Sequence, residues 1–278
     1  MSHRDGPGVV HLVGAGPGAA DLITVRGHRL VMTCDALVYD HLVDAELVNV
    51  SPAKIKINVG KKPGQHNIRQ SSINDVLVDL ATRPFGPRRI VRLKGGDPFL
   101  FGRGGEEVIA CLSRGIPVSV VPGVSAGVAG PAAAGIPLTH RDFTRGAVLV
   151  TGHTHDGGAL DLPWKELAST GFTLVFFMGV ATLSRITAKL IEHGLAPKTP
   201  SVVVQEATTP SQKVVIADVS TIAEAAANAG IRAPAVLVVG QVAGMAQMGR
   251  RDVRFDVNAG TVFHGVVEGC VGSLPSDA

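Results

Sequence analysis

The residues best suited to chemistry lie in the segment RLKGGDPFLFGRGGEE, residues 92–107, which leaves an apolar run and continues into a helical pattern. Its glycines are Gly95, Gly96, Gly102, Gly104 and Gly105. Glycine permits positive φ and lets a ligand approach the backbone, while Asp97 and Pro98 add a turn with one fixed carboxylate. The pattern favours a bound small molecule, and a tight surface connection is the alternative.

A second glycine-rich turn and one acidic residue could serve the same molecule. Gly14 to Gly18 (GAGPG) follow the apolar run Val9 to Val13 and resemble the start of a phosphate loop, although the spacing is G-x-G-x-G. Asp40 ends the next apolar run. An acidic residue at that point holds the ribose in dinucleotide folds. A dinucleotide site is therefore one interpretation that the residues leave open.

Two other polar stretches carry weaker signals. The basic stretch from Gly60 to Gln70 is typical of a solvated face. His153 and His155, with Asp156, lie on a predicted loop but lack the further spaced ligands that a zinc site needs. The sequence therefore predicts no metal, and it contains neither a nucleophile elbow nor a Walker loop.

Alternating apolar and amphipathic stretches predict an α/β fold that positions these residues. In the first half we expect strands at Val9–Val13, Ala36–Tyr39, Ile55–Val59, Arg89–Leu93 and Val118–Val121. We expect helices at Asp21–Thr33, Ala45–Val50, Ser71–Ala81 and Glu106–Arg114. Asp21 is placed to cap the first of these helices.

A polar stretch near Ile136 to Arg145 predicts a domain boundary, after which the alternation restarts. We expect strands at Ala147–Thr151, Thr173–Phe177, Ser201–Gln205, Val214–Ala217 and Ala235–Val239, and helices at Trp164–Ala168, Leu183–His193 and Thr221–Ala229. Thr221 and Glu224 have the spacing of a capping box. The predicted domains are therefore residues 8–138 and 145–248, each with its own sheet, followed by a loosely ordered tail, residues 250–278.

Composition bounds the partners and the compartment. A net charge of +3 on 278 residues, without a basic run, indicates no nucleic-acid partner. The three cysteines are far apart, which favours a reducing compartment, the cytoplasm. Residues 116–138 are uncharged but contain four prolines, so we expect no membrane-spanning helix. The N-terminus has no apolar core, so we expect no signal peptide.

Eight motifs in unbroken order, from about Val9 to Met245, carry a resemblance to a known family. They are GAGPG, YDHLV, VGKK with His66 and Gln70, RLKGGDPFLFGRGGEE, VPGVSA, AGIPLTHR, TGH and Met178-Gly179. Together they resemble the uroporphyrinogen-III C-methyltransferases of the tetrapyrrole methylase family. The resemblance implies a homodimeric, two-domain α/β enzyme with S-adenosylmethionine in a cleft between its domains. It implies no nicotinamide site.

The resemblance also assigns roles to individual residues. The implied S-adenosylmethionine contacts are Pro17, Gly95, Gly96, Asp97, Leu100, Ser125, Ala126, Met178 and Ala207. Asp40 would accept a proton and Lys61 would donate one. Because the substrate is a polycarboxylate, a polar set is expected to meet it: Lys62, His66, Arg69, Gln70, Arg103, His140 and Arg141. The chain departs from the pattern at Phe177 and Ala133, where relatives often have tyrosine.

We therefore expect conversion of uroporphyrinogen III to precorrin-2 with two S-adenosylmethionine molecules, giving S-adenosylhomocysteine and feeding sirohaem and cobalamin synthesis. Some relatives carry an N-terminal dehydrogenase-chelatase module, for which 278 residues leave no room, so methylation alone is expected. The alternatives are a methyltransferase for another tetrapyrrole, a dinucleotide-dependent oxidoreductase and a non-catalytic binding module.

Overall fold

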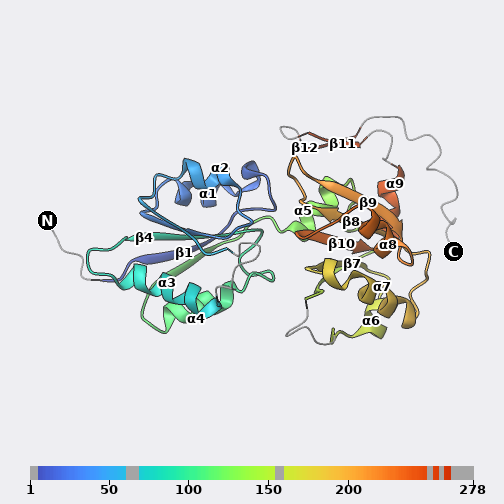
Figure 1. Ribbon diagram of the computed structural model, residues 1–278, viewed down its shortest axis with the longest axis horizontal. Coiled ribbons are helices and arrows are strands. Elements are labelled where there is room, and N and C mark those ends of the chain that lie inside the picture. Colours follow the sequence, from blue (N-terminus) through green and yellow to red (C-terminus); the bar gives the residue numbers. More distant parts are fainter. Residues whose placement is uncertain (1–5, 61–68, 154–159, 249–252, 257–259, 264–278) are drawn as a thin grey trace. The chain divides into compact units, whose positions relative to one another are not determined.

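The chain folds into two compact units, each with its own sheet (Figure 1). The computed structural model describes residues 6–60, 69–153, 160–248, 253–256 and 260–263. The division falls between Ala129 and Gly130, inside helix α5 (Ala126–Ala133). The polar stretch in which the sequence analysis placed its boundary, residues 136–145, lies in the second unit.

The first unit contains a five-stranded parallel sheet with the order β3-β2-β4-β1-β5. Its strands are β1 (Val9–Gly14), β2 (Ala36–Tyr39), β3 (Ile55–Asn58), β4 (Arg89–Lys94) and β5 (Val118–Val121). Each coincides with a predicted strand to within one residue at either end. Parallel sheets are covered on both faces, which is why these strands read as nearly continuous apolar runs.

Helices cover both faces of this sheet (Figure 1). On one face lie α1 (Val25–Val31) and α2 (Ala45–Val50), and on the other α3 (Gln70–Thr82) and α4 (Gly104–Leu112). Strand alternation divides the buried side chains between two cores. In β4, Val91 and Leu93 pack in the core with α1 and α2, whereas Ile90 packs in the core with α3 and α4. Arg92 and Lys94 therefore share the face of Ile90.

The first helix begins later than predicted. Thr24 is the N-cap of α1, and its Oγ1 accepts the N–H of Gly27 at 3.1 Å. Asp21 lies instead in a separate 3-10 turn, Ala20–Leu22, so the prediction that Asp21 caps a continuous helix was wrong. The two helical pieces are separated because Ile23 and Thr24 are extended.

The second unit has a mixed five-stranded sheet with the order β6-β7-β10-β8-β9. Its strands are β6 (Ala147–Thr151), β7 (Thr173–Phe177), β8 (Pro200–Gln205), β9 (Lys213–Asp218) and β10 (Ala235–Val239). Only the β6–β7 pairing is parallel; β10 is antiparallel to β7 and β8, and β8 is antiparallel to β9. All five strands were predicted, but their pairing was not.

Three helices of this unit share one apolar core with its sheet: α6 (Trp164–Ser169), α7 (Leu183–Glu192) and α8 (Ile222–Asn228). The predicted capping box of α8 does not form, because the Thr221 side chain makes no cap hydrogen bond. Its Oγ1 instead donates to the carbonyl of Asp218 at 3.3 Å. In α5, an added Cβ on Gly130 would lie 2.9 Å from Val236, so this helix packs closely on β10.

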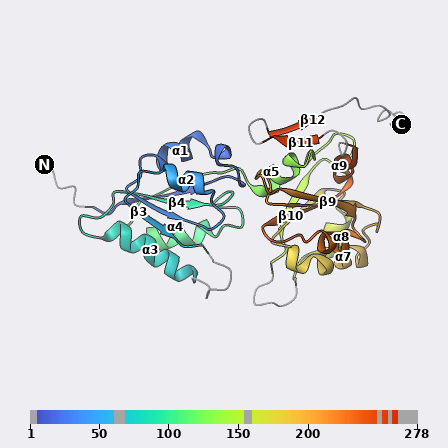
Figure 2. The ribbon, with the colours of Figure 1, turned by 45° about the horizontal axis from the view of Figure 1, so that its top comes forward.

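The last elements of the described residues were not predicted from the sequence, which was expected to form a loosely ordered tail from residue 250. After α9 (Met245–Met248), strands β11 (Val253–Asp256) and β12 (Gly260–Phe263) pair antiparallel in a sheet of their own (Figure 2). Among the helices that the structure describes, none has the length and apolar character needed to cross a bilayer.

Candidate functional site

The predicted site residues of the first unit follow the carboxyl ends of its strands. The second glycine-rich turn continues from β1, Asp40 follows β2 directly, and Gly95 follows β4 directly. Because the strands are parallel, all three connections lie at the same edge of the sheet, where open α/β sheets bind their ligands. The fold therefore gathers the two glycine-rich turns and the carboxylate.

The loops after β1, β4 and β5 are joined by their backbones. The N–H of Gly96 donates to the carbonyl of Gly16 at 2.6 Å, and the N–H of Gly16 donates back to Gly96 at 3.3 Å. A Cβ on Gly14 would lie 2.5 Å from the Cα of Gly123, and one on Gly123 would lie 2.2 Å from the carbonyl oxygen of Gly96. Only glycine fits Gly14 and Gly123 at this approach distance.

Asp97 fastens the same loops with both of its carboxylate oxygens. Oδ1 accepts the N–H of Phe99 at 2.8 Å and Oδ2 accepts the N–H of Gly123 at 3.0 Å. Gly96 has φ +66°, and the nearest atoms to an added Cβ, in Ser125 and Ala126, are 4.0 Å away. The backbone at Gly96 is therefore open to a ligand, whereas the Asp97 carboxylate is engaged within the protein.

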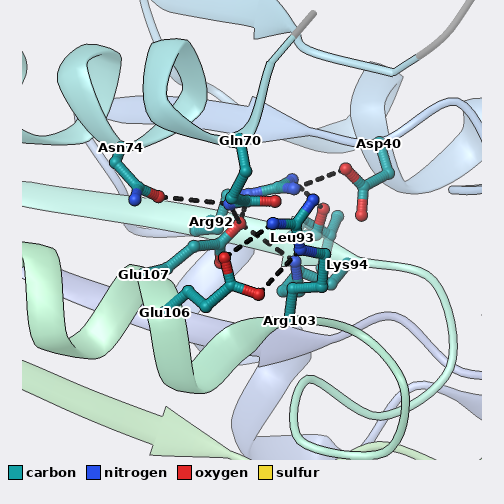
Figure 3. Close-up of polar contacts among 9 residues, drawn as sticks. All are labelled: Asp40, Gln70, Asn74, Arg92, Leu93, Lys94, Arg103, Glu106 and Glu107. Atoms are coloured by element: carbon teal, nitrogen blue, oxygen red, sulfur yellow. Dashed lines mark hydrogen bonds and ion pairs between the residues drawn. The ribbon is translucent and has the colours of Figure 1, made fainter. Parts of the chain in front are cut away.

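A buried polar network lies beneath Asp40 (Figure 3). The Arg92 side chain is 1% exposed, and its three nitrogens donate to three different groups. Nη2 donates to Asp40 Oδ1 at 2.5 Å, Nη1 to the carbonyl of Leu93 at 3.2 Å, and Nε to Glu107 Oε1 at 3.1 Å. The Asp40 side chain is 27% exposed, so this carboxylate is held by the buried Arg92 and is still accessible to a ligand.

The same network contains a second buried cation, Lys94. Its Nζ lies 3.0 Å from Glu107 Oε1. Burial, with the nearby Arg92 charge, lowers the pKa of Lys94, while Glu107 and Asp40 act in the opposite direction. Burial and the neighbouring Glu107 also raise the pKa of the Cys111 thiol to about 11. Cys111 is therefore a thiol, not a nucleophilic thiolate, near neutral pH.

The predicted substrate residues are found in different settings. Lys61, Lys62 and His66 lie outside the described residues. Arg69 is exposed at the start of α3, whereas Gln70 Nε2 donates to Glu107 Oε1 at 3.3 Å and to Asn74 at 3.1 Å. Arg103 is exposed and makes two 2.7 Å contacts with Glu106. In the second unit, the His140 ring lies against Phe143 and Arg141 is exposed.

The remaining predicted cofactor residues lie in loops of both units. Pro17 and Leu100 are half-buried, and Ser125 Oγ accepts the N–H of Gly127 at 3.2 Å. Met178 follows β7 with φ +53° and is 48% exposed. Ala207 is buried after β8, between two residues with positive φ. A left-handed backbone at non-glycine residues is uncommon and is found at functional sites.

The possible metal cluster is only partly described: His153 is placed, while His155 and Asp156 lie outside the described residues. Within the described part of the chain, no three His, Cys, Asp or Glu side chains are grouped as metal ligands.

Comparison with known proteins places this arrangement in a family. The family profile described as Tetrapyrrole (Corrin/Porphyrin) Methylases matches residues 9–223. The chain belongs to this family. The match includes both glycine-rich turns, Asp40 and the buried network, so these features are part of a tetrapyrrole methylase.

Curated relatives of this tetrapyrrole methylase include siroheme synthases. The protein from Methylococcus capsulatus is 45% identical over 239 residues, which are 86% of this chain and 50% of that protein. The protein from Pseudoalteromonas atlantica is 46% identical over 241 residues, 86% of this chain and 51% of that protein. The chain thus spans about half the length of these curated relatives.

Solved structures match over nearly their whole length. The native uroporphyrin III C-methyl transferase from Thermus thermophilus is 38% identical with a TM-score of 0.73, covering 86% of this chain and 100% of that one. The same enzyme complexed with S-adenyl homocysteine is 38% identical with a TM-score of 0.72, and the match covers 84% of this chain and 93% of that one. A cobalt precorrin-4 methyltransferase is 28% identical with a TM-score of 0.74, and the match covers 84% of this chain and 95% of that one.

Arg92, Lys94 and Glu107 were not predicted as functional residues, although their sequence pattern carries a signal. Two basic residues, Arg92 and Lys94, alternate with an apolar one at the end of a strand that is buried on both faces. Buried charges are almost always paired. The pattern therefore indicated a buried acidic partner, but not which residue supplies it.

Proposed function

We propose that this protein is a uroporphyrinogen-III C-methyltransferase that uses S-adenosylmethionine to form precorrin-2. The observation that carries the proposal is the 38% identity to the Thermus thermophilus uroporphyrin III C-methyl transferase across the whole of that chain. The cobalt precorrin-4 methyltransferase matches as well in fold but at 28% identity. Sequence similarity therefore favours uroporphyrinogen III over a cobalt precorrin, whereas the fold favours neither.

The glycine-rich turns suit an extended cofactor. The backbone at Gly96 is open, and the loops around it are fixed by hydrogen bonds to one another and to Asp97. We assign the cofactor contacts to Pro17, Gly95, Gly96, Asp97, Leu100, Ser125, Ala126, Met178 and Ala207. Both Asp97 carboxylate oxygens accept backbone N–H groups, so the carboxylate also fixes the loop that we place against the cofactor.

The donor supplies a methyl group on a positively charged sulfur. A pyrrole carbon of the substrate forms a bond to this methyl carbon as the carbon–sulfur bond breaks, leaving S-adenosylhomocysteine. Rigid loops favour this step, because holding two reactants in line can supply roughly 7–11 kcal/mol in favourable cases. The protein's main contribution is therefore orientation.

The proton chemistry is assigned to Asp40 and Lys61. Methylation leaves positive charge on the pyrrole ring, and the macrocycle must then lose one proton to become neutral. An ionised carboxylate can stabilise that charge and accept that proton. The Asp40 side chain meets both needs, because it is partly exposed and one of its oxygens is held by Arg92. Lys61, whose unperturbed pKa is about 10.4, would serve as the proton donor.

The substrate is a polycarboxylate, so basic side chains should meet its acidic groups. We assign this role to Lys62, His66, Arg69, Arg103, His140 and Arg141. Arg103 is already paired with Glu106, so its binding to a substrate carboxylate requires exchange of one acidic partner for another. Since that pair is exposed, the exchange costs little. Gln70 was also expected here, but its amide is engaged with Glu107 and Asn74.

An assay with purified protein tests the proposal. Incubated anaerobically with uroporphyrinogen III and S-adenosylmethionine, it should give a product with two added methyl groups and two S-adenosylhomocysteine molecules per macrocycle. Parallel incubations with methylated and cobalt-containing precorrins provide the comparison. Methylation of one of these, and none of uroporphyrinogen III, would refute the substrate while leaving the cofactor assignment intact.

Two further features belong to this proposal. A homodimer is expected from the resemblance alone, and light scattering of the purified protein measures it. The predicted cytoplasmic location rests on the cysteine distribution. The dehydrogenase and chelatase steps that siroheme synthesis requires are not assigned to the residues of this chain.

A further inference from the structure

Glu107 lies at the centre of the buried network, although neither the glycine-rich motif that it ends nor the proposed reaction assigns it a role. Its side chain is 0% exposed on α4. Its Oε1 accepts hydrogen bonds from Arg92, Lys94 and Gln70, at distances of 3.1, 3.0 and 3.3 Å. Oε2 has no hydrogen-bond partner among the described residues. A carboxylate is costly to bury unless it is paired. The function of Glu107 therefore follows from what it does to these three donors.

We propose that Glu107 is a positioning residue for the methyl transfer, acting on Asp40 through Arg92. The proposal rests on the function proposed above. A guanidinium is a planar fork, so fixing one nitrogen restricts the direction of the others. Glu107 holds Nε of Arg92, and the Leu93 carbonyl holds Nη1. The remaining nitrogen, Nη2, is thereby directed to Asp40 Oδ1 (Figure 3).

Charge supports the same role. Arg92 and Lys94 are two residues apart on β4, so both point to the face covered by α4. Two buried cations at this spacing repel each other, and Arg92 is one cause of the lowered pKa of Lys94. Glu107 is the fully buried counterion that both of them contact. Without its charge, Asp40 would be the carboxylate that remains paired with Arg92 in the network.

Gln70 extends the network to a second element. It is the first residue of α3 and donates to the same Glu107 oxygen as the two cations. Glu107 thus connects the end of β4 to the start of α3. We therefore assign Gln70 to holding Glu107, in place of the substrate contact expected from sequence.

A double-mutant cycle separates positioning from simple structural support. Glu107→Gln keeps the shape and removes the charge, and we expect kcat to fall about 100-fold, as misplacement of a reacting group can cause. The KM for S-adenosylmethionine should change little, and Glu107→Asp should recover part of the rate. If Glu107 acts through Asp40, the double variant with Asp40→Asn should be no slower than Asp40→Asn alone.

Asp79→Asn is the matched control. It removes a carboxylate of the same unit that is 64% exposed and paired with Arg83, outside the network. It should leave kcat at the wild-type value. Circular dichroism and calorimetric S-adenosylhomocysteine binding verify that each variant is folded.

Three results would overturn the inference: an unchanged kcat in folded Glu107→Gln, losses that multiply in the double variant, or a loss confined to KM. If Glu107→Gln does not fold, Gln70→Leu removes one donor to the same oxygen and should lower kcat at unchanged KM for the tetrapyrrole. If Gln70→Leu raised only the KM for the tetrapyrrole, Gln70 would contact the substrate and would not act through Glu107. If only another precorrin is methylated, the proposed function fails, and the same cycle with that acceptor still decides the role of Glu107.

Discussion

Asp40 combines two properties that a catalytic carboxylate needs. One oxygen is fixed by a fully buried guanidinium, and 27% of the side chain remains exposed to meet a ligand. Arg92 is in turn held by Glu107 and the Leu93 carbonyl. The position of one carboxylate is thus set by residues of β4 and α4.

Asp40→Asn separates the two interpretations that the sequence left open. As the proton acceptor, Asp40 should be needed for turnover, and its loss should lower kcat by about 10²–10⁴-fold, the range of general-base catalysis. The affinity for S-adenosylhomocysteine, measured by calorimetry, should stay near that of the wild type. Normal turnover at saturating cofactor, with strongly weakened cofactor binding, would instead indicate a ribose ligand.

The sequence was sufficient to predict where Asp40 lies along the chain but not its surroundings. The predicted strand Ala36–Tyr39 placed this carboxylate directly after a strand, and the structure has the same strand bounds. The pairing of Arg92 with Glu107 joins residues fifteen positions apart across a strand, a loop and a helix. No local pattern reports such a contact, because it depends on which helix face meets which strand face.

At the scale of elements, the three loops at the carboxyl edge of the first sheet depend on glycines at which a Cβ would clash. Gly123→Ala would place a Cβ 2.2 Å from the carbonyl oxygen of Gly96. Crowding of this kind typically costs about 1–3 kcal/mol. We expect Gly123→Ala to lower both the free energy of unfolding, measured with urea, and the affinity for S-adenosylhomocysteine.

Gly105→Ala is the control for that substitution. An added Cβ there meets no atom within 4 Å, and Gly105 lies in α4, where alanine is favoured by up to about 1 kcal/mol. Its stability should equal or exceed that of the wild type. If Gly123→Ala and Gly105→Ala had equal unfolding free energies and equal affinities for S-adenosylhomocysteine, the close approach of these loops would contribute neither to stability nor to cofactor binding.

Element boundaries show where local sequence is informative. The ten predicted strands were all found, because runs of β-branched residues bounded by glycine and proline are typical of strands. Helix starts were less reliable: Asp21 and Thr24 are both of a residue type that caps helices, and the structure uses Thr24. The pairing of β11 with β12 was also missed, since the pattern had been interpreted as irregular.

At the scale of the whole molecule, the two units differ in sheet topology, although the same alternation of strands and helices predicted an α/β sheet in each. The first sheet is entirely parallel, whereas the second is largely antiparallel. The proposed cofactor residues come from both: Met178 and Ala207 belong to the second unit and the others to the first. The resemblance implies one set of cofactor contacts per chain, so we propose that one chain holds one S-adenosylmethionine at a time.

The order of methylation tests this single set. If one cofactor must react and be replaced before the second transfer, a time course at limiting S-adenosylmethionine should reveal a singly methylated macrocycle first. The doubly methylated product should then appear after a lag, as the first species declines. Mass spectrometry of quenched samples measures both. Because S-adenosylhomocysteine competes for the same residues, an enzyme that destroys it should shorten the lag. A doubly methylated product formed from the outset, with no singly methylated species at any time, would contradict one cofactor per chain.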